Sequence, residues 1–274
     1  MYFVLGLIII AFILVYFGID RKRQEASIAK LWERLDEKGA QKVFEPAMAD
    51  ALPEPARRYL LRSITPGTPL AHSIRLHMTG SMRLKPGAEL LPMSADQILA
   101  PPHGFIWKAR VGRGLFQFAG FDRYAEGVGE MRWWLYGLLP IVKAKGPDLD
   151  RSAAGRLAGE AIFLASALLS PNGAQWVPES DTVAHYRMVI DTEPVTVSIS
   201  VKPDGLLERV SIKRWRGDLE GKKSGYFRFD VDEFSDVKTF GGYTIQTKFR
   251  AGWELGLPSE FPFFYASIDS AEYH

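Results

Sequence analysis

The sequence of 274 residues contains no cysteine, which excludes disulfide bonds, thiolate metal sites and thiol nucleophiles. Its five histidines are scattered without the spacing of metal ligands. The glycine pairs in "GVGRG" and "GVGEM" do not complete a phosphate-binding loop between a strand and a helix. The formal net charge of +2 is too small to indicate a nucleic-acid partner. We therefore expect no metal, no cofactor and no nucleic acid.

No basic side chain precedes the first apolar run, "YFVLGLIIIAFILVYFGI", and no small-x-small cleavage site follows it. A cleaved signal peptide would have both features. As a helix the run spans roughly 27 Å, close to the thickness of a bilayer core. The sequence therefore predicts an uncleaved, single-pass anchor in the cell membrane over residues 1–20, with the bilayer as a partner.

Three basic residues, Arg21, Lys22 and Arg23, directly follow the apolar run. By the positive-inside rule they predict that the C-terminal domain is cytoplasmic. A short span of the opposite orientation is the alternative.

Residues 21–50 are predicted to form a juxtamembrane amphipathic helix and a linker. Ile28, Leu31, Trp32 and Leu35 recur at helical spacing. Their apolar stripe can pack on the following domain or lie on the bilayer, and packing on the domain is the favoured interpretation.

From residue 72 the hydrophobic period changes from 3.6 to 2, which is typical of half-buried strands. We predict about nine strands, joined by short turns and without βα alternation, which excludes a parallel α/β fold. The expected fold is mainly β (α+β), a large curved antiparallel sheet or half-barrel over residues 51–274. The stretch "SADQILA" is predicted as a short helix capped by Ser94. A long helix over Ser152–Ser170 would cover one face of the sheet.

One carboxylate, Glu160, lies on the apolar side of this long helix. It needs a partner, because burying an unpaired carboxylate costs several kcal/mol. Arg156 lies one turn before it, and Arg123, next to Asp122 in "FDRY", is a second candidate. Three interpretations follow: an ion-pair network that docks the helix, a polar end of an apolar cavity, or acid/base catalysis.

Two other stretches carry open alternatives. The apolar stretch "MRWWLYGLLPIV" is too short to cross a bilayer, so it is a core strand, a cavity wall or a membrane-dipping segment. If it is extended, Trp133 and Trp134 face opposite ways. In "FDVDEFSD", Asp230 and Asp232 share one strand face; this could attract a cation, but a solvated face is favoured.

An ordered set of motifs resembles a family of bacterial proteins of unknown function that often carry an N-terminal anchor. The motifs are "LPEPARRYL", "SADQILAPPHGFIWKAR", "FDRYAEGVGEMRWWLYGLLPIV" and "GPDLDRSAAGRLAGEAIFLASALL", within residues 50 to 274. Arg156 and Glu160 match the family's helix motif, whereas "LASALL" lacks the proline of that motif. The resemblance implies a curved half-barrel similar to periplasmic lipoprotein carriers, which hold acyl chains between a sheet and covering helices.

We favour a non-enzymatic domain that binds a lipid or another apolar small molecule in a cavity between sheet and helix. No catalytic residue is assigned. The expected ligand-binding residues are Glu160, Arg156, Arg123, Asp122, Trp107, Trp134 and Phe163. One alternative is a hydrolase or transferase that acts on a membrane-derived substrate through Glu160. Another is a structural scaffold with a solid core.

Overall fold

The structure is a computed structural model that describes residues 2–36, 42–169, 173–217 and 224–274. It is built around one antiparallel sheet of thirteen strands. The strands are β1 (Ile74–Met82), β2 (Leu91–Ala100), β3 (Gly104–Val111), β4 (Phe118–Ala125), β5 (Val128–Leu135), β6 (Leu139–Lys145), β7 (Gln175–Pro178), β8 (Val183–Ile190), β9 (Glu193–Val201), β10 (Leu207–Arg216), β11 (Gly225–Phe240), β12 (Tyr243–Trp253) and β13 (Phe261–Tyr273).

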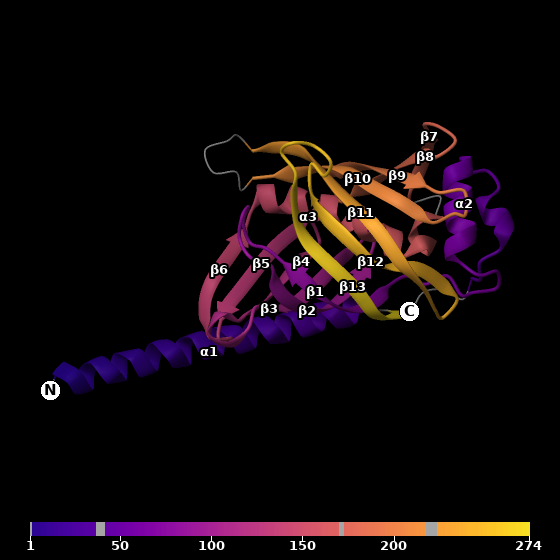
Figure 1. Cartoon of the computed structure of the whole chain (residues 1–274). Helices are drawn as coiled ribbons and strands as arrows, with labels where there is room; N and C mark the ends of the chain where they lie inside the picture. The colour runs from indigo at the N-terminus through magenta and orange to yellow at the C-terminus, as the bar shows by residue number, and fades with distance from the viewer. Residues whose placement is uncertain (1, 37–41, 170–172, 218–223) are drawn as a thin grey trace.

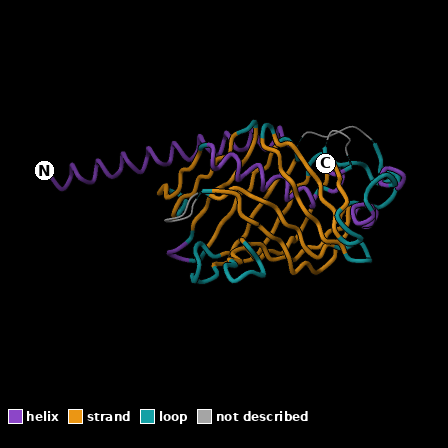
Figure 2. The backbone as a smooth tube through the Cα atoms, turned by 90° about the horizontal axis from the view of Figure 1, so that it is seen from above, coloured by secondary structure: helices purple, strands orange, loops and turns teal. Residues whose placement is uncertain are grey.

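The order across the sheet is β6-β5-β4-β3-β2-β1-β13-β12-β11-β10-β9-β8-β7, so the first and last strands of the domain, β1 and β13, pair at its centre. The sheet curls into a half-barrel with two arms (Figures 1 and 2). The predicted curved antiparallel sheet is therefore confirmed, with more strands than expected.

The helices are α1 (Tyr2–Leu35), α2 (Glu54–Ser63) and α3 (Pro147–Glu160), with short 3-10 turns η1 (Pro46–Ala49), η2 (Gly114–Phe116), η3 (Ala161–Phe163) and η4 (Ala165–Leu168). None of the described residues in the apolar part of α1 is buried, and this part is long enough to cross a membrane. The later part of α1 lies on the convex face of the sheet, where Ile28, Leu31 and Leu35 are buried in one cluster with Ile98 and Ile106. Packing of this stripe on the domain is confirmed.

The helix α3 lies on the concave face and contacts both arms, β4 to β6 on one side and β8 to β10 on the other. It begins at Pro147, earlier than predicted, and Asp148 and Asp150 occupy its first turn. It ends at Glu160 and continues as 3-10 turns. Gly155 and Gly159 let it approach β10, because a Cβ at Gly159 would collide with the side chain of Ile212.

The prediction of a helix over "SADQILA" is wrong, because these residues belong to the central strand β2. It pairs with β1 and β3 in continuous register. Met93, Ala95, Gln97 and Leu99 face the concave side, and Ile98 packs on the convex side, against α1. Pairing on both edges and burial on both faces override the weak local helix signal.

The stretch "MRWWLYGLLPIV" forms the hairpin of β5 and β6. Trp133 and Trp134 are both buried, on opposite faces: Trp133 joins the concave core and Trp134 joins the cluster under α1. The core-strand interpretation therefore holds for β5. It does not hold for β6, where Leu139 and Ile141 are exposed at the edge of the sheet.

Candidate functional site

A polar cluster lies on the concave face where α3 crosses the first arm. The Arg156 guanidinium donates from Nε to Glu160 Oε1 at 2.7 Å and from Nη1 to Asp122 Oδ2 at 3.3 Å. The second oxygen of Glu160 accepts a hydrogen bond from Gln97 Nε2 at 2.5 Å. The Trp133 indole N–H donates to Asp122 Oδ1 at 3.0 Å. One arginine thus joins two carboxylates that come from the helix and from β4.

The cluster lies against aromatic rings. The Arg156 guanidinium carbon is 4.6 Å from the centroid of the Phe105 ring and 5.2 Å from that of Trp107. Trp107 in turn packs on Trp133 and Phe264, with ring centroids 5.8 Å and 6.1 Å apart. Such cation–π contacts add about 0.5–2 kcal/mol each and fix the orientation of the guanidinium plane.

The electrostatics of the cluster centre on Asp122. Burial raises the pKa of its carboxyl above the usual value, although Arg156, the Trp133 N–H and Arg214 act in the opposite direction, and Glu160 adds to the increase. A carboxyl of this kind holds its proton more readily than one in water.

The three charged side chains stay partly accessible, at 25% for Glu160, 18% for Asp122 and 15% for Arg156. The concave wall beside them is apolar. Its partly buried members pack against the main core and include Met82, Met131, Phe229, Phe249 and Phe264. Partly accessible charge next to partly accessible apolar surface is the composition of a site for an amphipathic molecule.

Two hollows in the described part of the chain lie elsewhere, and neither borders Glu160, where the predicted cavity would lie. A pocket of about 20 Å³, room for about one water molecule, lies beside Phe163 and Tyr59. A groove of about 420 Å³ lies on the convex face beside Trp32. Several charged side chains line the groove; among them Arg75 is paired with Asp36, and His77 with Asp96.

The sequence profile of the Family of unknown function (DUF6544) matches residues 42–266. The chain belongs to this family. No match is found among curated proteins.

Among solved structures, this DUF6544 chain is similar to a putative outer membrane lipoprotein-sorting protein domain from Vibrio parahaemolyticus. The sequence identity is 8%, the match covers 82% of this chain and 93% of the other, and the TM-score is 0.44. It is also similar to a LolA superfamily protein from Nitrosomonas europaea, at 7% identity, 80% and 92% coverage and a TM-score of 0.45.

The structure brings four of the seven expected residues of the DUF6544 chain together: Glu160, Arg156, Asp122 and Trp107. It separates Arg123 and Trp134 from them. Arg123 is therefore not the partner of Glu160; its Nη2 lies 2.7 Å from Glu130 Oε2 on the convex face. Adjacent residues of a strand point to opposite faces, so Asp122 and Arg123 of "FDRY" cannot share one site.

Trp134 lies on the convex face too, with its ring centroid 6.0 Å from that of Phe121. Phe163 lies on the concave side, in the buried core, with its ring 5.3 Å from Phe249. Sequence reasoning missed Gln97 and Trp133. Gln97 was hidden by the incorrect helix over "SADQILA"; its signal is an amide that alternates with apolar residues in a central strand.

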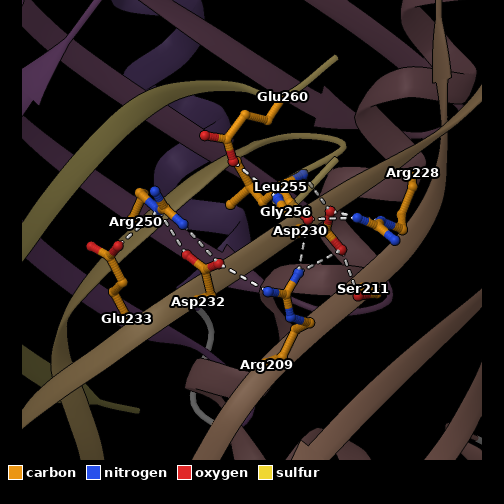
Figure 3. Close-up of polar contacts among 10 residues, drawn as sticks. All are labelled: Arg209, Ser211, Arg228, Asp230, Asp232, Glu233, Arg250, Leu255, Gly256 and Glu260. Atoms are coloured by element: carbon orange, nitrogen blue, oxygen red, sulfur yellow. Dashed lines mark hydrogen bonds and ion pairs between the residues drawn. The ribbon is translucent and has the colours of Figure 1, made fainter. Parts of the chain in front are cut away.

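The interpretation of Asp230 and Asp232 as a solvated strand face is wrong. Both are buried on the convex face of β11 and paired with arginines (Figure 3). Arg228 Nε donates to Asp230 Oδ2 at 2.8 Å, and Arg250 Nε donates to Asp232 Oδ1 at 2.9 Å. Arg209 lies between the two carboxylates, 3.2 Å from Asp232 Oδ2. The arginines already neutralise both carboxylates, so an additional cation would gain little by binding there.

The same network ties down the turn between β12 and β13. The backbone N–H of Leu255 donates to Asp230 Oδ2 at 2.9 Å, and the Leu255 carbonyl accepts from Arg228 and Arg209. This cluster therefore has a structural role. Within the described ranges, no three histidine or acidic side chains converge in an arrangement that would hold a metal ion.

Proposed function

We propose that the protein is a membrane-anchored half-barrel that binds an amphipathic lipid on its concave face. The apolar chain lies against Phe264, Phe249 and Phe229, and the headgroup lies at Arg156 and Glu160. The observation that carries this proposal is the partly accessible ion cluster set into a partly accessible aromatic wall.

The concave face and an amphipathic lipid have matching apolar and polar parts. Burial of the acyl chain against the aromatic wall removes apolar surface from water and stabilises the complex by about 25 cal/mol per Å². Arg156 and the two carboxylates can exchange part of their mutual hydrogen bonding for hydrogen bonds to a polar headgroup.

The helix α1 supports a role as membrane anchor, because none of the described residues in its apolar part is buried, whereas Ile28, Leu31 and Leu35 further along the helix are packed on the sheet. We propose residues 1–20 as the anchor, 21–50 as the juxtamembrane segment and linker, and 51–274 as the half-barrel domain. The cations that follow the span favour a cytoplasmic domain.

Catalysis by Glu160 has less support. Both of its carboxylate oxygens accept hydrogen bonds, from Arg156 and Gln97. Two protein donors therefore already hold this carboxylate in place, which is the arrangement of a positioned, structural or ligand-orienting group.

Native mass spectrometry of the full chain released from detergent micelles tests binding. The wild type is expected to retain one lipid per chain. Phe264→Asn, on the concave face of β13, is expected to lower retention at least tenfold, because it removes apolar contact area and adds an amide. Its neighbour Tyr265→Asn points to the convex face and is the matched control.

Retention that is equal in the wild type and both variants would contradict the proposal and favour the solid scaffold. A parallel Arg156→Gln variant tests the polar end. Loss of one headgroup class with other lipids retained would identify the headgroup that the cluster binds.

A further inference from the structure

Three turns lie in a row at one end of the strands of the first arm. They are residues 83–90 between β1 and β2, 112–117 between β3 and β4, and 136–138 between β5 and β6. Alternation in an antiparallel sheet places them at the same ends of neighbouring strands. Backbone hydrogen bonds join them: Gly112 N–H donates to Pro92 O at 2.8 Å, and Tyr136 N–H donates to Gln117 O at 3.2 Å. We call these turns, with Leu139, the apolar rim.

The rim exposes large apolar side chains. Phe116 is 71% exposed and Tyr136 is 55% exposed, and Leu84, Leu90 and Leu139 are exposed as well. Single exposed apolar residues are common on soluble proteins, but several apolar side chains gathered in neighbouring turns indicate a contact surface.

The rim is fixed to the end of the membrane helix. Arg21, two residues after the apolar run, donates a hydrogen bond to the carbonyl of Gly137 in the third turn. The Arg21 guanidinium carbon is 5.8 Å from the Trp134 ring, and Arg132 lies 3.7 Å from Asp20. In Figure 1 the hairpin of β5 and β6 meets α1 where that helix leaves the sheet, whereas α2 lies at the far end of the molecule.

We infer that the apolar rim rests in the lipid–water interface, as a second membrane contact beside α1. A helix that spans the bilayer up to Ile19 brings Gly137 to the bilayer surface through Arg21. The rim has three cations, Arg83, Lys85 and Arg113, against one carboxylate, Glu89. Aromatic rings at headgroup depth and cations near anionic lipid are the composition of interfacial protein segments.

The inference rests on the proposed anchor and not on the proposed ligand. It adds an orientation: Met82 and Leu91, at the rim end of the concave face, pair across β1 and β2 directly above the turn 83–90. The apolar concave wall therefore continues into the bilayer contact.

The absence of cysteine makes single-cysteine labelling a direct test. Three full-length variants carry an environment-sensitive fluorophore at Val15→Cys in the span, at Phe116→Cys in the rim and at Met48→Cys. Met48 is exposed on η1, which lies beside α2 at the far end. The proteins are reconstituted in vesicles of phosphatidylcholine and phosphatidylglycerol, and quenching by spin-labelled lipid is measured.

The inference predicts strong quenching at residues 15 and 116, at least threefold above that at residue 48. Quenching at residue 116 equal to that at residue 48, with residue 15 quenched, would overturn the rim contact alone. Absence of quenching at residue 15 would overturn the anchor and the rim together. Phe116 is exposed, so its substitution leaves the core intact.

Discussion

Arg156 is the residue on which the concave site depends. It faces two carboxylates and two aromatic rings at once, and it comes from a helix that touches both arms of the half-barrel. A guanidinium suits this position, because its planar fork can donate in several directions while its face stacks on a ring. A lysine would keep the charge and lose the stacking.

We predict that Asp122→Asn leaves the protein as stable as the wild type, or more stable, at pH 7. Because the folded-state pKa of Asp122 lies above its unfolded value, folding disfavours its ionised form. Its contribution to stability is therefore fully present below the unfolded pKa of about 3.9 and declines as the pH rises through the folded pKa.

Thermal unfolding of the full chain in mild detergent measures this effect. The variant should match the wild type near pH 4 and equal or exceed its Tm at pH 7, while lipid retention falls. A Tm well below that of the wild type at pH 7 alone would show that Asp122 serves stability and would count against a binding role.

The pairing of Arg156 with Glu160 could be predicted from the sequence, because a spacing of four residues on a helix fixes their proximity. Asp122 and Arg123 could not be assigned to the correct faces. A strand of alternating polar and apolar residues shows that its faces differ, but "FDRY" has a charged residue for each face. The faces are set by the cross-strand pairs on β3: Asp122 pairs with Trp107, and Arg123 pairs with Ile106.

At the scale of the elements, a buried carboxylate on the convex face, Glu130 of β5, joins the hairpin of β5 and β6 to β4 through ion pairs. Glu130 accepts from Arg132, Arg123 and Lys145 at 2.9, 2.7 and 3.2 Å. Burial alone would raise the pKa of Glu130, but hydrogen bonds from these three cations outweigh it and hold the pKa below its usual value.

We predict that Glu130→Gln lowers the stability at pH 7 by about 3 kcal/mol, the low end for breaking a buried ion pair. A depressed carboxyl pKa contributes stability above the unfolded pKa of about 4.3, and this contribution is lost as the pH falls through the folded pKa. The difference between variant and wild type in thermal unfolding should therefore shrink below about pH 4. A difference that is constant from pH 3 to pH 7 would exclude the charge as its cause.

The strands with clear alternation were predictable, and β2 was not. Its four final residues, from Gln97 to Ala100, are all buried, so the period-2 signal disappears where both faces are covered. The end of α3 was also missed, because the passage from α-helix to 3-10 turns after Glu160 follows contacts with α2 and with the sheet. Tyr59 and Tyr186, for instance, donate to the carbonyls of Ile162 and Ala158.

At the scale of the whole molecule, the curvature of the sheet followed from its many short-turn strands and its size. The closure of the two arms did not. Asp191, in the turn between β8 and β9, accepts from the Tyr124 hydroxyl at 2.7 Å and from the Gly127 N–H at 3.0 Å. Contacts between segments so far apart in the chain leave no local signal in the sequence.

We predict that the domain lies in the cytoplasm, on the side of Arg21, Lys22 and Arg23. Val189 is 64% exposed on the domain, so Val189→Cys can be labelled without unfolding. A membrane-impermeant maleimide should modify this variant only after cells are permeabilised. Labelling in intact cells would place the domain outside and reverse the orientation.

The most direct test of lipid binding is the position at which a lipid acyl chain touches the protein. Full-length protein in membranes that contain a lipid with a diazirine near the end of its acyl chain is irradiated, and the modified peptides are mapped by mass spectrometry. The account predicts modification of concave-facing residues in β13, such as Phe264 and Ala266, in addition to α1. Modification confined to α1 and the apolar rim would contradict it.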